Sequence, residues 1–288
     1  MTWAPQLEAV GRIASSEERI AQYTRLLEHA LHDTPSASLP SLVRTYVDGA
    51  VLDPVNTTGA GLLVGRHMLA HLATQLAAAH IPANILCTIV SDTLATCEAS
   101  SIMGDDELGP WRVLLAEQYA SLSRWRDAAQ ALQSITPHAA RRIPQLSFAQ
   151  LCVRVVELWL HDLPSHVAEA EQAIKRANSA ILDERDNKAL VHELWSYHAR
   201  VLAIQHRFME AAARYMDLPH ADMYAAVYAI ISPPSAQRTS MLTRLVQQAS
   251  AWPFAQTLHH AAEGRFLRPA DLEALAPFLG GVPVQPDV

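Results

Sequence analysis

Apolar residues recur along much of the chain with the 3.6-residue period of an amphipathic helix. Two segments show it clearly: Tyr23, Leu26, Leu27, Ala30 and Leu31 within 18–32, and Leu62, Leu63, Leu69, Leu72 and Leu76 within 62–79. This spacing predicts a helix over each segment. The intervening stretch 33–40 carries Pro35, Ser36, Ser38 and Pro40 and predicts a loop.

The central part of the sequence contains no glycine between Gly109 and Gly264. It is rich in Ala, Leu, Arg, Gln and Glu, which favour helices, whereas β-hairpins usually need glycine at their turns. Prolines mark the breaks instead, at positions 110, 137, 144, 164, 219, 233, 234, 253 and 269. The pattern predicts an all-α protein with helices of about 12 to 18 residues.

Three Ala-rich segments recur at spacings of 42 and 41 residues, Asp127–Leu132, Glu169–Ile174 and Glu210–Tyr215. In each unit one helix ends, a turn follows, and the Ala-rich helix packs back. This period is typical of solenoids built from helical hairpins, such as tetratricopeptide-like and HEAT-like repeats. The sequence therefore predicts a right-handed solenoid.

Large side chains keep the same register in front of the first and third segments. Tyr119 and Trp125 precede Asp127 by eight and two residues, and Leu202 and Phe208 precede Glu210 by the same distances. In the middle unit Trp159 lies ten residues before Glu169, which predicts a turn about two residues longer.

The residues expected to pack the repeats together are these large side chains and the small residues that permit close helix crossings. They are Tyr119, Trp125, Ala129, Trp159, Ala170, Leu202, Phe208, Ala212 and Tyr215. The aromatic positions could instead form a ligand-binding stripe. Packing is the preferred interpretation, because burial of an aromatic side chain of about 150–250 Å² is by itself strongly favourable.

Cysteine usage and the N-terminal residues bear on the compartment. The three cysteines, Cys87, Cys97 and Cys152, are odd in number and show no C-x-x-C spacing, which argues against a disulfide framework and a structural zinc site and favours a reducing intracellular compartment. Residues 1–20 carry several charges and no apolar block, so we expect no secretory signal.

The distribution of charged residues argues against a membrane span and against a nucleic-acid-binding face. Residues 67–91 lack Asp, Glu, Lys and Arg, but histidines, Asn84 and Pro82 interrupt them, so they are interpreted as buried helices rather than a membrane span. The net charge of −7 and the scarcity of basic clusters disfavour a nucleic-acid-binding face.

Candidate catalytic chemistry is weak. His67 and His71 lie on one helical face and could bind a metal, which leaves a metal-dependent enzyme as an alternative, but Met68 stands where a zincin motif has glutamate and no third ligand is evident. The spacing of Gly59, Gly61 and Gly65 resembles that of a phosphate-binding loop. Such a loop follows a buried strand, whereas the residues before Gly59 have the composition of a loop, so the glycines are interpreted as the start of a helix.

One acidic run completes the set of candidate groups. Residues 105–107, Asp-Asp-Glu, could hold a cation, although a solvated loop is the preferred interpretation. We therefore expect no catalytic, cofactor-binding or metal-binding residues.

Five segments resemble the COP9 signalosome subunit 4 family. Arg207–Leu218 is similar to the family's R-K-F-x-E-A-A-x-R-Y-x-E-L stretch. Four more matches fall in the family's order. Arg66–Leu69 is similar to R-Q-L-L, and Arg112–Ile135 contains Trp125–Gln130, which is similar to the family's D-W-R-N-A-A-Q segment. Gln237–Leu242 is similar to Q-R-S-R-M-L, and Arg265–Leu272 resembles the helix pair that follows. Together they extend over residues 20–280.

The resemblance implies a non-catalytic scaffold subunit. It implies a helical-repeat arm over 1–218 and the helical part of a PCI domain over 219–280, followed by a flexible tail over 281–288 in place of the family's winged helix. The loop after Leu218 is shorter than the family's by about ten residues.

The implied partners are other signalosome subunits, including the module with the metalloisopeptidase that removes Nedd8 from cullin-RING ligases, in the cytoplasm and nucleus; no nucleic acid, membrane or cofactor is expected. Two alternatives remain open: a PCI scaffold subunit of the proteasome lid, and a free-standing helical-repeat adaptor.

Overall fold

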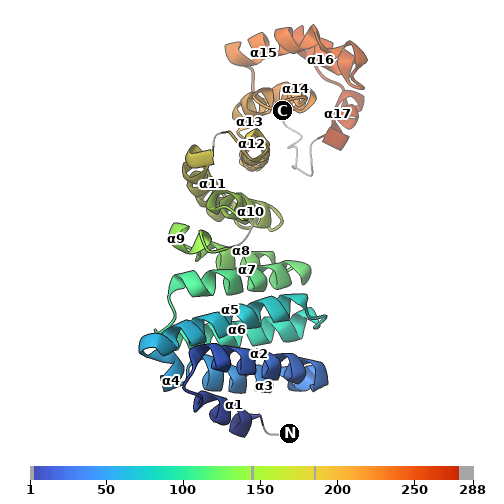
Figure 1. The fold of residues 1–288 in the computed structure, drawn as a ribbon. Coiled ribbons are helices and arrows are strands. Elements are labelled where there is room, and N and C mark those ends of the chain that lie inside the picture. Colours follow the sequence, from blue (N-terminus) through green and yellow to red (C-terminus); the bar gives the residue numbers. More distant parts are fainter. Residues whose placement is uncertain (1–2, 144–145, 185, 279–288) are drawn as a thin grey trace. The chain divides into compact units, whose positions relative to one another are not determined.

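The computed structural model describes residues 3–143, 146–184 and 186–278. These residues form helices and turns and contain no β-strand, which confirms the predicted all-α fold of consecutively packed helices (Figure 1). The chain divides into two compact units, residues 1–158 and 159–288. The boundary expected at residue 218 stays a prediction, and the tail expected over 281–288 lies outside the described residues.

The first unit contains the helices up to the boundary within α10. They are α1 (Ala4–Gly11), α2 (Ser16–Asp33), α3 (Leu39–Tyr46), α4 (Pro54–Thr57), α5 (Leu62–Ala78), α6 (Ala83–Ser100), α7 (Asp105–Ser121), α8 (Trp125–Gln133), α9 (Pro137–Ala140) and α10 (Phe148–Leu160). A π-helical segment, η2 (Val47–Val51), continues α3.

The second unit continues with shorter helices towards its end. They are α11 (Val167–Ile181), α12 (Lys188–Ile204), α13 (Phe208–Met216), α14 (Asp222–Ile231), α15 (Ala236–Val246), α16 (Ala255–Ala262) and α17 (Pro269–Leu275).

The helices expected from periodicity are present. α2 covers the segment 18–32, and α5 covers 62–78, one residue less than expected. The stretch between α2 and α3 contains a short 3₁₀ turn, Ser36–Ser38, and α3 begins at Leu39, within the loop expected over 33–40. Two of the three second helices of the repeats are shorter than expected, since α8 and α13 have nine residues each, whereas α11 has 15. Pro137 and Pro219 follow α8 and α13 closely, and proline disfavours continuation of a helix.

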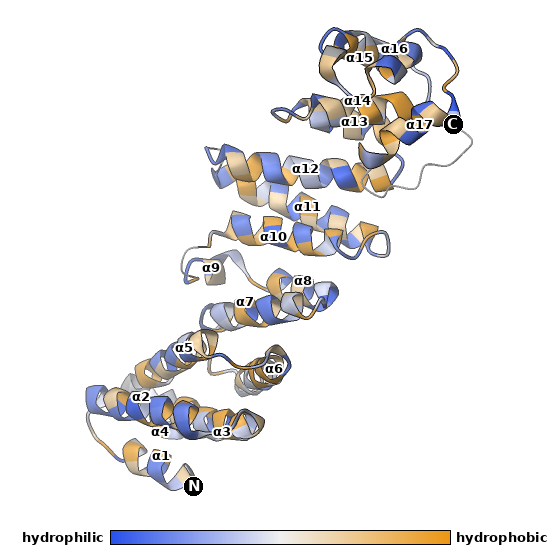
Figure 2. Ribbon diagram, turned by 90° about the vertical axis from the view of Figure 1, so that its right-hand side faces the viewer, coloured by the Kyte–Doolittle hydropathy of each residue, from blue (hydrophilic) through white to orange (hydrophobic). Residues whose placement is uncertain are grey.

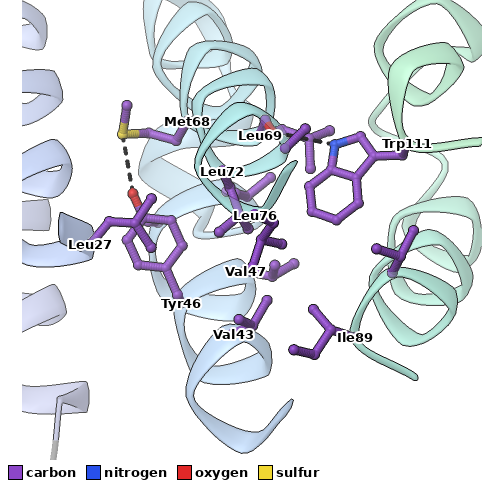
Figure 3. Close-up of a cluster of buried hydrophobic side chains, with 14 of the residues drawn as sticks. Leu27, Val43, Tyr46, Val47, Met68, Leu69, Leu72, Leu76, Ile89 and Trp111 are labelled. Atoms are coloured by element: carbon purple, nitrogen blue, oxygen red, sulfur yellow. Dashed lines mark hydrogen bonds between the residues drawn. The ribbon is translucent and has the colours of Figure 1, made fainter. Parts of the chain in front are cut away.

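The core of the first unit lies where α2, α3, α5, α6 and α7 present their apolar stripes to one another (Figures 2 and 3). The Tyr46 hydroxyl lies 3.4 Å from the Met68 sulfur, and the Trp111 indole N–H donates to the Leu69 carbonyl at 3.3 Å. All four side chains are buried. The polar ends of the two aromatic residues are therefore satisfied inside an apolar cluster.

Close approach of α4 and η2 to α5 explains two glycines. A Cβ on Gly61 would lie 1.8 Å from the Val55 carbonyl oxygen, and one on Gly65 would lie 2.7 Å from that of Val51. Only glycine fits such contacts without movement of the backbone. α5 begins at Leu62, so Gly59 and Gly61 directly precede the helix and Gly65 lies in its first turn, which confirms that the glycines mark the start of a helix.

In the second unit Arg238 caps α14. Its guanidinium group donates to the carbonyl oxygens of Ala229 and Ile230, both at 3.0 Å, beyond which Pro233 and Pro234 end the helix. These carbonyls at a helix C-terminus lack intrahelical partners, so a cation there is favourable. The arginine of the Gln237–Leu242 motif thus has a structural role.

Candidate functional site

The candidate site is the set of hairpins in which the repeat register was predicted. In the α7–α8 turn Ser123 adopts a left-handed conformation with φ of 58°. The Arg124 N–H donates to the Tyr119 carbonyl at 2.8 Å, and that of Ser123 to the Ala120 carbonyl at 2.9 Å. This pair of bonds closes the end of α7 and reverses the chain.

The α12–α13 turn repeats this geometry. His206 has φ of 60°, Arg207 N–H donates to the Leu202 carbonyl at 2.9 Å, and His206 N–H donates to the Ala203 carbonyl at 3.0 Å. The second helices α8, α11 and α13 begin at residues 125, 167 and 208, the 42- and 41-residue spacings of the sequence repeat. The periodicity therefore corresponds to repeated backbone geometry.

An arginine and a carboxylate recur at the start of the second helix. Arg124 Nε donates to Asp127 at 2.7 Å, and Arg207 Nε donates to Glu210 at 2.8 Å. These groups are well exposed, so solvent screens each pair and its contribution to stability is small. Their main effect is to orient the turn.

The middle hairpin has the longer turn expected from Trp159. Six residues separate α10 from α11, compared with three in the other two hairpins, so the turn is longer by three residues rather than two. Within this loop the His166 ring lies 5.4 Å from the Trp159 ring and near Asp162 and Glu169.

The structure places most of the nine predicted packing residues in the interior. Seven are buried: Ala129, Trp159, Ala170, Leu202, Phe208, Ala212 and Tyr215. Tyr119 and Trp125 are only half-buried, because they flank the exposed α7–α8 turn. The Arg124 guanidinium lies 4.4 Å from the centre of the Tyr119 ring, so this aromatic residue supports the turn through a cation–π contact.

We expect a larger residue at Ala129 to destabilise the α7–α8 hairpin. Ala129 is 0% exposed, so Ala129→Leu has to displace its neighbours, at a cost of about 1–3 kcal/mol. Urea unfolding followed by circular dichroism measures the loss. Gln130→Leu adds similar apolar bulk at the adjacent exposed position and should change stability by less than about 0.5 kcal/mol. Equal effects of the two substitutions would contradict the assigned register.

Tyr215 lies in an aromatic stack in the second unit. Its ring centre is 5.4 Å from that of Tyr228, and their planes are nearly parallel. Burial is the main cause that raises the pKa of Tyr215, and the neighbouring Tyr228 raises it further. Burial also raises the pKa of Tyr228. The folded state therefore favours the neutral phenols.

This stack predicts a loss of stability at alkaline pH. Because the folded pKa values are raised, the stabilisation is complete below the unfolded phenol pKa of about 10 and is lost as the pH rises above it. The free energy of unfolding in urea should fall between about pH 9.5 and 11.5, and Tyr215→Phe should flatten this fall. Tyr224→Phe, at a more exposed ring, is the control. An unchanged slope in Tyr215→Phe would argue against this origin.

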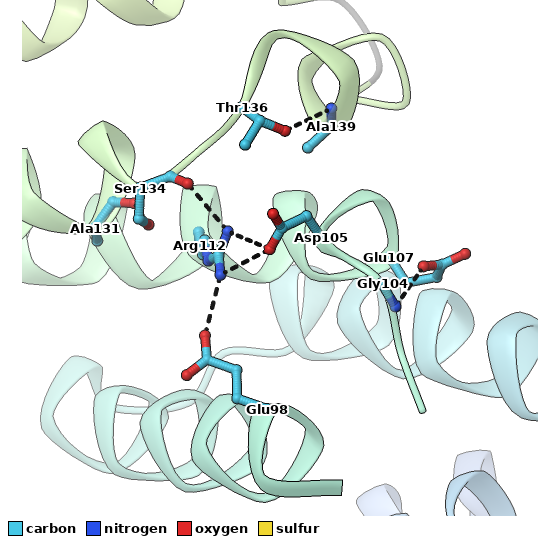
Figure 4. A network of polar contacts seen from close by, with 9 residues as sticks. All are labelled: Glu98, Gly104, Asp105, Glu107, Arg112, Ala131, Ser134, Thr136 and Ala139. Atoms are coloured by element: carbon cyan, nitrogen blue, oxygen red, sulfur yellow. Dashed lines mark hydrogen bonds and ion pairs between the residues drawn. The ribbon is translucent and has the colours of Figure 1, made fainter. Parts of the chain in front are cut away.

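A polar network that was not predicted joins α6, α7 and α8 (Figure 4). Arg112 on α7 lies 3.1 Å from Glu98 and 3.3 Å from Asp105, and donates to the Ser134 carbonyl at 3.2 Å. Its side chain is only 11% exposed, so the guanidinium is well shielded from solvent. One arginine thus links three successive helices, and its place in the Arg112–Ile135 motif was the only sequence signal for it.

The acidic run 105–107 is not the solvated loop that was preferred from the sequence. It forms the first turn of α7, where carboxylates interact favourably with the helix N-terminus. Glu107 is 8% exposed; it accepts from Arg142 at 3.1 Å and forms an ion pair with Arg66, whose Nε lies 3.1 Å away, while Asp106 lies 2.6 Å from His138. Basic side chains from α5 and from the region of α9 therefore occupy the positions that a bound cation would need.

The candidate metal pair does not acquire further ligands. His67 is exposed and His71 half-buried, with the His71 Nε2 3.4 Å from the Gln75 side-chain amide. Across the described residues, no group of three or more His, Cys, Asp or Glu side chains is arranged to hold a metal ion. In the same residues no helix combines the length and apolar character needed to cross a membrane.

Comparison with known proteins gives one consistent result. No family model matches the sequence. The chain is 28% identical to COP9 signalosome complex subunit 4 of Caenorhabditis elegans, over 84% of the chain and 65% of that protein. It is 24% identical to the Drosophila melanogaster protein of the same name over 80% of the chain, and 25% identical to the Arabidopsis thaliana one over 70%.

The matched region spans between about half and two thirds of these relatives, namely 65%, 56% and 48% of their lengths. Three proteins of one name, from two animals and a plant, share this region with the chain. The ordered motifs and the all-helical fold agree with that similarity. The chain is therefore similar to COP9 signalosome subunit 4 over most of its length.

Proposed function

We propose that the chain is a scaffold subunit of a COP9 signalosome. In this role it holds other subunits and substrate, while the metalloisopeptidase carried by another subunit removes Nedd8 from cullin-RING ubiquitin ligases. The similarity to subunit 4 from three species is the observation that carries the proposal. The proposed place of action is the cytoplasm and the nucleus.

The hairpin architecture supports a scaffold role. Repeated hairpins offer extended surfaces to which neighbouring hairpins contribute, and such surfaces suit the binding of several partners at once. The paired turns at Ser123 and His206 and the Arg112 network hold neighbouring helices in defined positions. We further propose that residues 1–218 act as the arm and residues 219–280 as the helical part of a PCI domain.

Native mass spectrometry of the endogenous complex tests the assembly. A tagged copy of the full chain, expressed at its natural level, should co-purify with signalosome subunits, including the one that carries the isopeptidase. Recovery with proteasome lid subunits would assign the chain to that related assembly instead. Recovery of the chain alone would favour a free-standing adaptor and contradict the proposal.

An activity assay tests the absence of catalysis. The purified chain incubated with a Nedd8-conjugated cullin should release no Nedd8, whereas the intact complex should release it. Metal-dependent release by the chain alone would overturn the scaffold assignment.

A further inference from the structure

An open groove lies at the N-terminal end of the first unit. Its volume is about 520 Å³, and it is bounded by Trp3 and Ala4 at the start of α1, by the connection from Asp33 to Ser38, and by one face of α3. Trp3 is half-buried, and the Asp33 side chain is 49% exposed. The groove therefore combines an aromatic wall with a carboxylate that solvent can reach.

The hydroxyl groups of α3 face this groove as acceptors. Ser41 donates its proton to the Ser38 carbonyl at 2.8 Å, and Thr45 donates to the Ser41 carbonyl at 2.9 Å. With their protons engaged, these hydroxyl oxygens can only accept further hydrogen bonds. The groove thus favours a ligand that is rich in donors.

Asp33 retains capacity to accept from such a ligand. His29 Nδ1 lies 3.0 Å from one carboxylate oxygen and His32 Nδ1 3.2 Å from the other. A carboxylate offers about four acceptor sites, so these contacts orient Asp33 and leave other sites open. None of the described residues lining the groove is a lysine or arginine, and the basic side chains that contact Asp33 are those of His29 and His32.

The charge of the surrounding sequence also favours a cation. Residues 1–108 contain 12 acidic residues, five arginines and no lysine, whereas residues 109–288 contain 17 acidic and 17 basic residues. The whole formal charge of −7 therefore lies in the segment that carries the groove. The electrostatic field of this excess negative charge raises the association rate of a positively charged partner.

We infer that the groove binds an arginine side chain presented by a partner protein. A guanidinium group is planar, offers five donors, stacks on an indole and pairs with a carboxylate. These properties match Trp3, Asp33 and the acceptor oxygens of Ser41 and Thr45. The inference concerns a separate surface and does not depend on the chain's place in a signalosome.

NMR titration of the full chain tests this inference. The probe is the peptide acetyl-Gly-Arg-Gly-amide, and the matched ligand is its citrulline analogue, which keeps the shape but lacks the charge. The arginine peptide should shift the Trp3 indole N–H resonance, which is assigned by its loss in Trp3→Phe. The citrulline peptide should bind at least about tenfold more weakly, since charge-assisted and cation–π contacts are lost.

Substitutions locate the binding to the groove. Asp33→Asn and Trp3→Ala should each weaken binding about three- to tenfold, whereas Asp186→Asn, the same charge change at an exposed site in the second unit, should have no effect. Equal binding of the two peptides, or shifts confined to residues outside the groove, would overturn the inference. A shift of the Trp3 resonance on dilution without peptide would indicate that a second copy of the chain fills the groove, and would also overturn it. The comparison of peptides on the unmodified protein stays decisive even if a variant misfolds.

Discussion

Trp111→Ala should lower the free energy of unfolding of the first unit by about 3–5 kcal/mol. Trp111 is 0% exposed, and its indole N–H donates to the Leu69 carbonyl, so truncation removes a large apolar area and leaves a cavity between α5 and α7. Urea unfolding followed by circular dichroism measures the loss. Because the chain has two units, unfolding can show two transitions, and the one that belongs to the first unit has to be identified. Ala129 lies in the first unit, so the transition that Ala129→Leu shifts is the one to follow.

Trp125→Ala is the matched control. The same side chain is removed from a half-buried position beside an exposed turn, so the loss should be clearly smaller than for Trp111→Ala. A loss at Trp111 below about 1 kcal/mol, or one equal to that at Trp125, would show that Trp111 is not a packing centre of the first unit.

Asn56→Ala should cost about 3 kcal/mol, although a single small polar side chain is shortened. Asn56 is 0% exposed, accepts from Arg19 at 2.8 Å and donates to the Ala50 carbonyl at 3.0 Å and to the Tyr23 hydroxyl at 3.3 Å. Arg19 is itself 5% exposed, so the substitution leaves a buried cation without this acceptor. An unsatisfied buried charge is more costly than a lost neutral hydrogen bond.

A double-mutant cycle separates this cause from general loss of packing. Arg19→Met keeps much of the aliphatic volume and removes the charge. If the buried cation is the source of the loss, Asn56→Ala should cost at least about 1 kcal/mol less in the Arg19→Met background. Strict additivity of the two substitutions would contradict this explanation.

The helical character and the repeat register could be predicted because both depend on residues close together in the chain. Periodic apolar positions determine which stretches become α2 and α5, and the Ala-rich segments mark the starts of α8, α11 and α13 within one residue of a constant period. The order of the motifs likewise indicated the similarity to COP9 signalosome subunit 4. Local sequence was sufficient for these features.

Other features depend on contacts between segments far apart in sequence. Glu107 meets Arg66 and Arg142, which lie 41 and 35 positions away, so a charge pattern read along the chain suggested a solvated loop instead. Similarly, the sequence placed Gly61 and Gly65 at the start of a helix, but the carbonyl oxygens of α4 and η2 that require glycine there belong to other segments. Sequence by itself determined which residues are helical and how the hairpins repeat. Only the tertiary structure decided which polar groups are buried together and where a groove forms, because burial and pairing arise from neighbours that the linear order does not specify.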